Sequence, residues 1–364
     1  MPDSAVIPAT ALALDTYRLL GRSGLRISPL ALGTMTFGTE WGWGADEAEA
    51  RRIFDSYVDR GGNFVDTANR YTEGTSETFL GRFMQNRRDR LVLATKYTLT
   101  SDPSDPNAGG NHRKNLMRSV EASLKRLQTD YIDLLYLHIW DERTPVEEVL
   151  RGFDDLVRSG KILYAGISDT PAWQVARMQT IADLRGWTPL VALQVEYSLI
   201  ERTVERDLIP MARELGLGVT PWSPLGSGVL TGKYGKADLA SGNGTASASG
   251  SRKDIAVAQK ALNERGLAIA EVVKQVAGEL GRSPAQVALA WTLLNDAVAA
   301  PIVGARTLQQ LEDNLGALDT RLDSNQQRRL LEVSAVDLGF PHEFIQRPLT
   351  QNVTFGEARI ARRR

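Results

Sequence analysis

The stretch GGNFVDTANRY, residues 61–71, carries the pattern that decides the fold. A short apolar run ends in Asp66, and a short loop then brings in Tyr71. The same pattern recurs farther along the chain, where LVLATK ends in Lys96 and IDLLYLH ends in His138. In a barrel of parallel strands the carboxyl ends of the strands share one mouth, so these four side chains can converge on one spot. The pattern therefore favours an enzyme.

Short runs rich in β-branched and aliphatic residues alternate with longer amphipathic stretches along most of the chain. This alternation is typical of βα units around a parallel sheet, and eight such units close a barrel. We therefore predict a protein of the α/β class with a (β/α)8 TIM barrel. The eight strands are expected at residues 30–33, 63–66, 91–96, 132–138, 163–168, 191–194, 217–220 and 298–303.

Further elements complete the predicted barrel. Residues 17–29 hold Gly21 and Gly24 between apolar positions and are expected to form an N-terminal β-hairpin at the barrel floor. Apolar spacing predicts helices between the strands and extra helices near the carboxyl terminus. These are expected at residues 46–60, 113–127, 146–158, 255–279, 284–295, 308–318 and 324–335.

The domain limits follow from composition. The segment ADLASGNGTASASGSRKD, residues 237–254, has too few apolar side chains to pack, so it is expected to be a mobile loop. A single barrel domain is expected over residues 15–340, with tails at residues 1–14 and 341–364. The second tail ends in the basic ARIARRR, and a terminal charge cluster of this size is usually just solvated.

Bulk composition limits the classes of function. With 42% hydrophobic residues and a formal net charge of −1, the chain gives no sign of a nucleic-acid partner. No apolar stretch reaches the roughly 18 residues of a membrane span, and the start lacks a signal-peptide pattern, so a cytoplasmic location is expected. The absence of cysteine excludes a thiolate nucleophile. The chain has three histidines and none has the HExxH spacing, so a histidine-rich metal site is not expected. Redox chemistry would therefore need a bound cofactor.

The four strand-end residues suggest acid chemistry on a carbonyl group. A buried Lys96 ammonium needs a partner, and Asp66 is the nearest candidate in the pattern. A positive charge beside Tyr71 would lower the pKa of its phenol and make it a better acid at neutral pH. A neutral His138 could donate a hydrogen bond to a carbonyl oxygen. Taken singly, Asp66 could instead cap a turn, Tyr71 could pack, and His138 could be a satisfied core residue.

At this point the chain resembles the aldo-keto reductase family over residues 17–318. The motifs that carry the resemblance are GGNFVDTANRY with a following SExxLG pattern, LVLATK, SLKRLQTDYIDLLYLH, PWSPLGSGVLTGKY and GARTLQQLEDN. The enlarged loop around His112 is similar to the aryl-alcohol dehydrogenase-like branch. The resemblance implies that Tyr71 is the proton donor, Lys96 lowers its pKa, Asp66 holds Lys96, and His138 orients the carbonyl.

The resemblance also implies a nicotinamide cofactor laid across the barrel mouth. No GxGxxG motif follows a strand, so a Rossmann site is not indicated. The guanidinium of Arg306 suits a 2′-phosphate, as does the positive N-terminus of the helix from Leu308, so NADP(H) is favoured over NAD(H). Asp169 departs from the usual asparagine, because a carboxylate cannot donate as an amide does. Matching positions for the cofactor are Gly33, Thr34, Met35 and Asp66 near the first strands, Ser168, Asp169 and Gln194 at the carboxamide, Trp222 stacked on the nicotinamide ring, Ser223, Leu225, Ser227 and Lys233 at the pyrophosphate, and Gly304, Arg306, Gln310 and Asn314 at the adenosine end.

The expected activity is the NADP-dependent reduction of a small aldehyde or ketone to an alcohol, in class EC 1.1.1. Trp41 and Trp140, with His138, are expected to contact the substrate, and Trp43 lies in the same loop as Trp41. Two alternatives stay open: a cofactor-sensing binding subunit similar to potassium-channel β subunits, and an alcohol dehydrogenase that uses NAD. Sequence alone does not give the natural substrate, the direction of the reaction or the oligomeric state.

Overall fold

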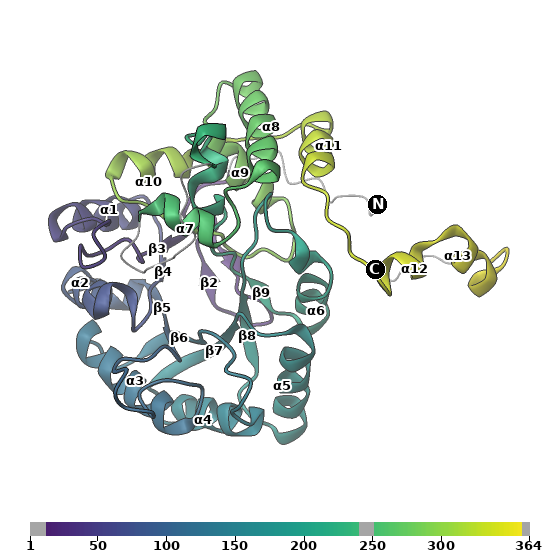
Figure 1. Ribbon diagram of the computed structural model, residues 1–364. Helices are drawn as coiled ribbons and strands as arrows, with labels where there is room; N and C mark the ends of the chain where they lie inside the picture. Colours follow the sequence, from purple (N-terminus) through teal and green to yellow (C-terminus); the bar gives the residue numbers. More distant parts are fainter. Residues whose placement is uncertain (1–11, 240–250, 359–364) are drawn as a thin grey trace.

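The computed structural model describes residues 12–239 and 251–358, and Figure 1 looks along its central barrel. Eight parallel strands form one sheet in the order β10-β3-β4-β5-β6-β7-β8-β9. Backbone hydrogen bonds from Val219 N to Ala297 O and from Ala299 N to Val219 O join the two ends of this sheet. The predicted (β/α)8 barrel is thereby confirmed. Its strands are β3 (Ala31–Gly33), β4 (Phe64–Asp66), β5 (Val92–Tyr97), β6 (Ile132–Leu137), β7 (Ile162–Ser168), β8 (Leu190–Gln194), β9 (Gly218–Val219) and β10 (Ile302–Gly304).

The predicted N-terminal hairpin is also confirmed. Strands β1 (Arg18–Leu19) and β2 (Arg26–Ile27) pair in antiparallel register. Leu20 and Ile27 are fully buried and belong to one apolar cluster with Phe64 and Leu134, which face the inside of the barrel. The hairpin therefore closes the amino-terminal end of the barrel, and the opposite end stays open for a site.

Helices surround the barrel and bury one apolar face each. Helix α1 begins where the Asp46 side chain accepts a hydrogen bond from Glu49 N, which satisfies one of the free amides of its first turn. Helices α3 and α4 have the predicted bounds. The helices of the ring and its extension are α1 (Glu47–Asp59), α2 (Thr75–Phe83), α3 (Arg113–Leu127), α4 (Val146–Arg158), α5 (Ala172–Arg185), α6 (Leu208–Leu215), α8 (Glu264–Leu280), α9 (Pro284–Leu293), α10 (Leu308–Leu315) and α11 (Ser324–Val333).

Several boundaries differ from the prediction, and the largest differences concern three segments. The helix expected over residues 255–279 is divided into α7 (Arg252–Ala258) and α8, because Lys260 takes a φ of 55° and Asn263 then caps α8. The last strand, expected at residues 298–303, is shorter and runs from Ile302 to Gly304. Of the loop expected at residues 237–254, residues 240–250 lie outside the described part, and its end already forms the start of α7.

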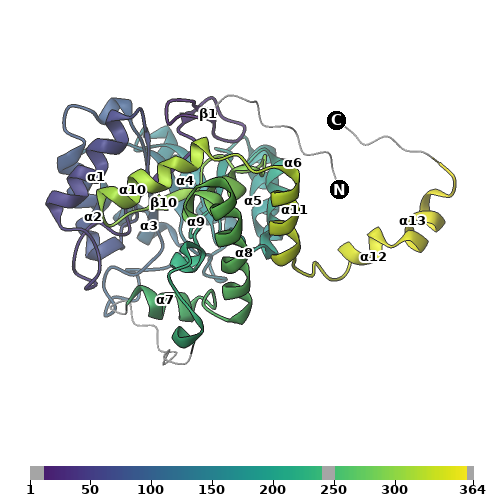
Figure 2. The ribbon, with the colours of Figure 1, turned by 90° about the horizontal axis from the view of Figure 1, so that it is seen from above.

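The carboxyl-terminal segment leaves the barrel. After α11, two short helices, α12 (His342–Gln346) and α13 (Pro348–Phe355), extend away from the ring of helices, as Figures 1 and 2 show from two directions. At the other end of the chain Leu14 is buried against the core, although it was expected in a tail. The domain limits of 15–340 remain a prediction. Within the described ranges, no helix combines the length and the apolar character that crossing a membrane requires.

Candidate active site

The strands β4 and β5 bring a buried ion pair to the open end of the barrel. Lys96 is fully buried, and its ammonium donates to Asp66 Oδ1 at 2.5 Å, to Thr67 O at 2.8 Å and to Tyr71 Oη at 3.1 Å. These three acceptors use all three donors of an ammonium group. The predicted pairing of Lys96 with Asp66 and Tyr71 is thus what the folded chain shows.

Asp66 is held from two sides. Its Oδ1 accepts from Lys96, and its Oδ2 accepts from the Gln194 amide at 3.0 Å, across the barrel from β8. Burial lowers the pKa of Lys96, but the charges of Asp66 and Tyr71 and the hydrogen bonds to both groups together raise this pKa above its ordinary value. The ammonium therefore keeps its proton at neutral pH, and the pair presents a fixed positive charge to Tyr71.

Tyr71 begins the short 3-10 helix η1 (Tyr71–Gly74), in which Thr72 and Glu73 take positive φ values of 47° and 57°. This turn returns the phenol over Lys96 at the end of β5. Burial raises the pKa of Tyr71 by more than the Lys96 charge lowers it, so the pKa lies above its ordinary value of 10. The expected lowering of this pKa by Lys96 is present, but burial outweighs it, so the phenol holds its proton at neutral pH.

His138 follows β6 and faces the phenol. The two rings lie 6.0 Å apart between centroids and almost perpendicular, at 82°. Burial and the Lys96 charge hold the pKa of His138 well below its usual range, so the imidazole is neutral at pH 7. Its Nδ1 is buried and has no hydrogen-bond partner. A neutral imidazole with a free ring nitrogen is what a polar ligand at this spot would meet.

A cavity of about 790 Å³ opens above these residues. Tyr71 and His138 form part of its wall, whereas Lys96 and Thr34 are fully buried and do not reach the surface of the cavity. Thr34 instead donates to Asp66 O at 2.9 Å, so the cofactor contact predicted for its side chain is not found. The other predicted cofactor positions all line the cavity: Gly33, Met35, Asp66, Ser168, Asp169, Gln194, Trp222, Ser223, Leu225, Ser227, Lys233, Gly304, Arg306, Gln310 and Asn314.

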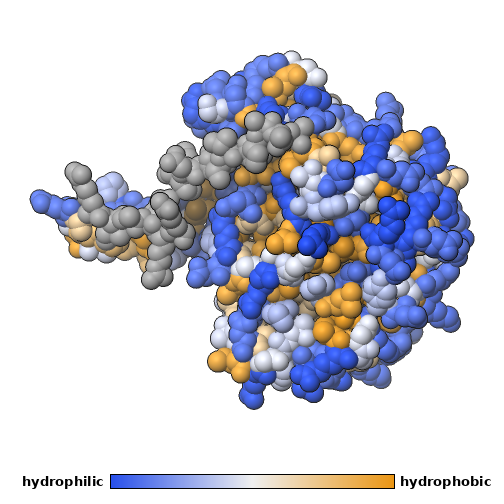
Figure 3. Space-filling model, turned by 180° about the vertical axis from the view of Figure 1, so that it is seen from behind, coloured by the Kyte–Doolittle hydropathy of each residue, from blue (hydrophilic) through white to orange (hydrophobic). Residues whose placement is uncertain are grey.

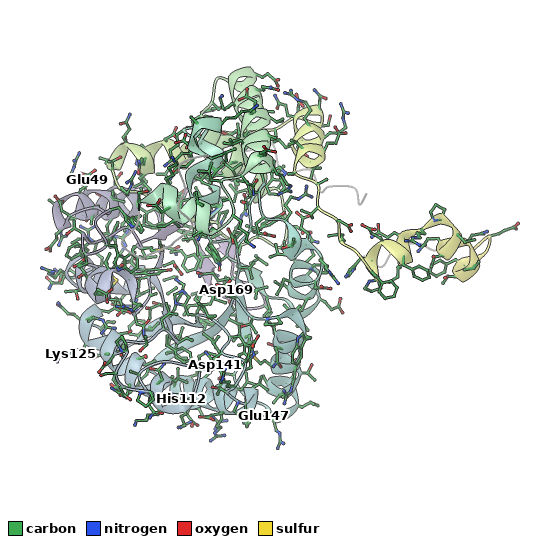
Figure 4. The ribbon with its side chains drawn as sticks, viewed as in Figure 1. Glu49, His112, Lys125, Asp141, Glu147 and Asp169 are labelled. Atoms are coloured by element: carbon green, nitrogen blue, oxygen red, sulfur yellow. The ribbon has the colours of Figure 1, made fainter. Side chains whose placement is uncertain are left out.

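The ends of β7 and β9 meet at Asp169 and Trp222. Ser168 Oγ is buried and unpartnered at the wall of the cavity. Asp169 lies near the middle of the mouth in Figure 4, with a φ of 39°, and its Oδ1 accepts from the Trp222 indole at 3.0 Å. Burial raises the pKa of Asp169 to about 6. The sequence put the cofactor contact of Asp169 in doubt. In the structure, the Asp169 carboxylate accepts from the Trp222 indole and thereby orients that ring.

The loop after β9 lines the cavity with Ser223, Leu225, Ser227 and Gly228. Ser223, Gly226, Ser227 and Gly228 all have positive φ values, between 51° and 91°. Its shape is held by backbone amides, because Gly226 N donates to Ser223 O, Ser227 N to Ser223 Oγ and Gly228 N to Leu225 O. A Cβ added to Gly228 would lie 2.9 Å from Lys233 Nζ, so the ammonium lies directly against this loop.

The adenosine end of the predicted site lies at β10 and α10. Arg306 N donates to Gln310 Oε1 at 2.9 Å, which folds the Gln310 side chain back over the first turn of α10. The first amide of this helix, Leu308 N, is not free, because it donates to Glu49 Oε1 at 2.7 Å. Glu49 belongs to α1, which lies beside α10 (Figure 4). One amide of the helix N-terminus that is expected to face a phosphate is therefore already bonded.

Aromatic side chains wall the outer part of the cavity. Trp41 and Trp43 both line it, with ring centroids 5.8 Å apart, and the Trp41 indole donates to Glu73 at 3.2 Å. Trp140 is buried in the main core and is not part of the cavity wall, so its substrate contact stays a prediction. His112 caps α3 by accepting from Asn115 N at 3.3 Å, and it also stays outside the cavity.

Several cavity residues were not predicted from the sequence. Arg70 and Glu73 form an ion pair beside Tyr71, and Gln259 from the end of α7 accepts a hydrogen bond from Ser227 Oγ. Glu196, next to Trp222 in a β-bridge, has its pKa raised to about 7 by burial and by its acidic neighbours Glu201 and Asp169. Arg70 stands directly before Tyr71, a position that could have drawn attention to it. Gln259 carried no such signal, because only the fold brings α7 over the mouth.

Comparison with known proteins agrees with this geometry. A family model described as "Aldo/keto reductase family" matches residues 29–335. The chain belongs to this family. Norsolorinic acid reductase of Aspergillus flavus is 37% identical over 356 residues, which cover 95% of this chain and 88% of that protein. Aryl-alcohol dehydrogenase (NADP+) of Phanerodontia chrysosporium is 36% identical over 354 residues, which cover 93% of this chain and 91% of that protein.

A bacterial relative extends the same result. The oxidoreductase YrpG of Bacillus subtilis is 42% identical over 329 residues, which cover 87% of this chain and 95% of that protein. The resemblance drawn from the motifs is thus confirmed, and this aldo/keto reductase is an oxidoreductase. Among the residues that the structure describes, no group of three or more His, Asp or Glu has the arrangement of a metal site.

Proposed function

We propose that this chain reduces an aldehyde or ketone to an alcohol with NADPH, in class EC 1.1.1, with Tyr71 as the proton donor. One observation carries the proposal: Tyr71 Oη lies 3.1 Å from a buried ammonium that is itself 2.5 Å from Asp66. The phenol keeps its proton at neutral pH, and the adjacent positive charge stabilises the phenolate that remains after proton transfer. The open cavity at Tyr71 gives a small carbonyl compound access to that proton.

Each catalytic side chain has one task in this mechanism. Tyr71 gives its hydroxyl proton to the carbonyl oxygen. Lys96 meets the negative charge left on the phenolate, and Asp66 keeps Lys96 in place and charged. A neutral His138 retains one ring N–H, which can hold the carbonyl oxygen beside Tyr71 without competing as an acid. When bound, the nicotinamide ring would supply the hydride.

The residues present fit a dinucleotide. The unpartnered Ser168 Oγ suits a carboxamide, and Trp222, held by Asp169, suits a stacked ring. Because Gln194 Nε2 is already bonded to Asp66, a carboxamide contact of Gln194 would use its Oε1. Lys233, together with Ser223 and Ser227 on the loop that it contacts, lines the cavity and suits a pyrophosphate. Arg306 suits a 2′-phosphate, which favours NADPH.

Replacement of Tyr71 by phenylalanine tests the proposal. Tyr71→Phe removes the proton but keeps the ring, so turnover of an aromatic aldehyde should fall about 10²–10⁴-fold while the NADPH dissociation constant stays within about twofold. Turnover is followed by NADPH absorbance, and affinity by fluorescence titration. Tyr131→Phe is the matched control, because Tyr131 precedes β6 at the closed end and its hydroxyl donates to Asp89 at the surface, far from the cavity. Unchanged turnover in Tyr71→Phe would refute the assignment.

The wild-type chain also tests the alternative of a binding subunit. Tight NADPH binding with negligible turnover on a broad panel of aldehydes and ketones would favour a cofactor-sensing binding subunit over an enzyme. Measurable reduction of an aldehyde or ketone by the wild-type chain, lost in Tyr71→Phe, would exclude the binding subunit.

A second candidate function is an alcohol dehydrogenase that uses NAD. The observation in its favour is Glu49, whose carboxylate lies at Leu308 N, two residues from Arg306, and would repel a 2′-phosphate. Dissociation constants of NADPH and NADH decide between the two. If NADPH is preferred through Arg306, Arg306→Ala should weaken NADPH binding at least about tenfold and leave NADH nearly unchanged. Equal losses for both cofactors would contradict this role of Arg306.

A further inference from the structure

The carboxyl-terminal arm, residues 336–358, concentrates exposed apolar side chains. Twelve large apolar residues are exposed among the described residues, and six of them lie between residues 340 and 355. Leu349 and Val353 are one turn apart on α13 and are 73% and 74% exposed. Single exposed apolar residues are normal on a protein surface, but a continuous set on one short segment marks an interaction site.

This arm touches the barrel only at its root among the contacts of the described residues. Arg206 donates to Phe340 O at 3.1 Å, and His342 Nε2 lies 3.1 Å from Asp207 Oδ1. Beyond these two contacts, α12 and α13 stand clear of the ring of helices in Figures 1 and 2, and Figure 3 shows apolar surface on the arm beyond the outline of the barrel. Phe340 and Phe344 contact each other, at 5.9 Å between ring centroids, but the apolar side chains of α13 stay exposed in one chain.

An apolar groove lies beside the same root. It has a volume of about 460 Å³ and is formed by Pro171, Ala172 and Trp173 at the start of α5, with Val204 and Leu208 beside α6. Trp173 is 65% exposed, which is unusual for so large a ring. Asp207, which bonds to His342 of the arm, is also part of the wall of the groove. Groove and arm are thus adjacent at the root, while the apolar end of the arm points elsewhere.

We propose that this arm lies in the groove of a second copy of the chain, so that two copies exchange arms about a twofold axis near Asp207. A twofold contact is self-complementary, and it needs the arm and its receiving groove on the same chain, as found here. To fill its own groove, the arm would have to reverse direction at His342, whose side chain is already bonded at the groove's edge. A second copy needs no such reversal.

The area involved is sufficient for a stable dimer. The four apolar side chains beyond Phe344, which are Ile345, Leu349, Val353 and Phe355, are about half to three-quarters exposed and offer on the order of 400 Å² per arm, since one such side chain presents about 150–200 Å² when fully exposed. Two arms and the two groove surfaces that they cover then bury roughly 1,500 Å², which is within the range of stable interfaces. The substrate cavity is a separate hollow, so the proposal does not rest on the proposed function.

The first test measures mass and dissociation in solution. Light scattering on the full chain should give twice the 40.0 kDa of one chain. Leu349→Asp with Val353→Asp should weaken the dimer at least about tenfold, because each places a charge in a buried apolar contact. Leu184→Asp is the matched control, since Leu184 is 80% exposed on α5 but lies outside the groove, and it should leave the dimer unchanged. A monomeric wild-type chain, or a dimer that the arm variants do not weaken, overturns the proposal.

Mixing of variants tests the exchange itself. Trp173→Asp should also weaken the dimer, but an equal mixture with Leu349→Asp should recover part of it, because one of the two arm contacts is then intact in the mixed dimer. The chain has no cysteine, so single thiols can be added without background. Leu349→Cys mixed with Thr203→Cys and a short bismaleimide should give a cross-link between two chains. Cross-linking only within a chain that carries both substitutions would show the arm in its own groove and refute the exchange.

Discussion

On the β4 and β5 side of the mouth, polar groups are held by side chains on strands, whereas on the β9 side they are held by the backbone of a loop. Asp66 and Lys96 lie within strands, are almost fully buried and have every donor of the ammonium paired. Ser223 and Gly228 lie in a loop where positive φ angles aim the backbone itself.

This difference fits the two tasks proposed for the two sides. A proton must leave from one atom in one direction, so its donor needs a geometry fixed by a strand and by paired charges. A pyrophosphate is large and diffuse in charge, so it suits a loop whose shape is fixed by its own backbone hydrogen bonds and which presents several polar groups. We therefore expect side-chain changes to break the first region and backbone changes to break the second.

The largest effect is expected at Lys96. Lys96→Met leaves the Asp66 carboxylate buried without its cation, so the free energy of unfolding should fall by about 3–5 kcal/mol and turnover by at least about 10³-fold. Urea unfolding and aldehyde turnover measure the two losses. Lys161→Met is the control, because Lys161 pairs with Glu121 at the surface and should change stability by no more than about 1 kcal/mol.

A second variant separates charge from chemistry in the same region. Adding Asp66→Asn to Lys96→Met removes both buried charges, so much of the lost stability should return while turnover stays lost. If Lys96→Met alone were as stable as the wild type, the buried ion pair would not be what holds this side of the mouth.

The next effect concerns the loop after β9. Gly228→Ala forces a Cβ onto a residue with a φ of 91° and toward Lys233 Nζ, so NADPH binding should weaken about 10- to 100-fold. Gly160→Ala is the matched control, since Gly160 has a φ of 74° with open space around it, after α4 at the closed end. Both variants should lose similar stability, and only Gly228→Ala should lose cofactor affinity in a fluorescence titration. Equal affinity would argue against a phosphate-binding loop.

The smallest effect is expected at Asp169, which lies between the two regions. Its pKa is about 6 in the folded chain against 3.8 ordinarily, so the folded state holds a proton that the unfolded state releases between these values. The free energy of unfolding therefore falls as pH rises from about 4 to about 6. Above this range the folded chain bears the whole destabilisation that comes from burying an ionised Asp169. Asp169→Asn removes this cost while its amide oxygen can still accept from Trp222, so unfolding at about pH 7.5 should need about 1–3 kcal/mol more.

The measurement for Asp169 is urea unfolding at about pH 5 and about pH 7.5. The difference between the two pH values should shrink in Asp169→Asn. Glu196→Gln serves as a comparison, because Glu196 has a raised pKa of about 7 and would cause its own pH dependence. A pH dependence that is the same in Asp169→Asn and in the wild type would contradict the buried, partly protonated carboxyl.

The sequence predicted the strands and the polar residues at their ends, because the spacing of apolar residues along the chain follows directly from which face is buried. It did not predict contacts between segments that are far apart in the chain. Trp140 reads as a mouth residue from its place after β6, yet it is buried in the core. Glu49 gave no signal in the sequence, and it lies at Leu308 N only because α1 and α10 are neighbours. The pKa of Tyr71 also depends on burial, which no local pattern reports.

The sequence by itself determined the eight βα units and the polar residues Asp66, Tyr71 and Lys96 at or just past the ends of the strands, because apolar runs and the polar residues that follow them are local properties. Only the tertiary structure decided the balance between burial and charge at Tyr71, the partner of Asp169, and the exposure of the arm's apolar residues in the described part of the chain. These depend on distances between segments far apart in the chain, and such distances exist only after the barrel has closed.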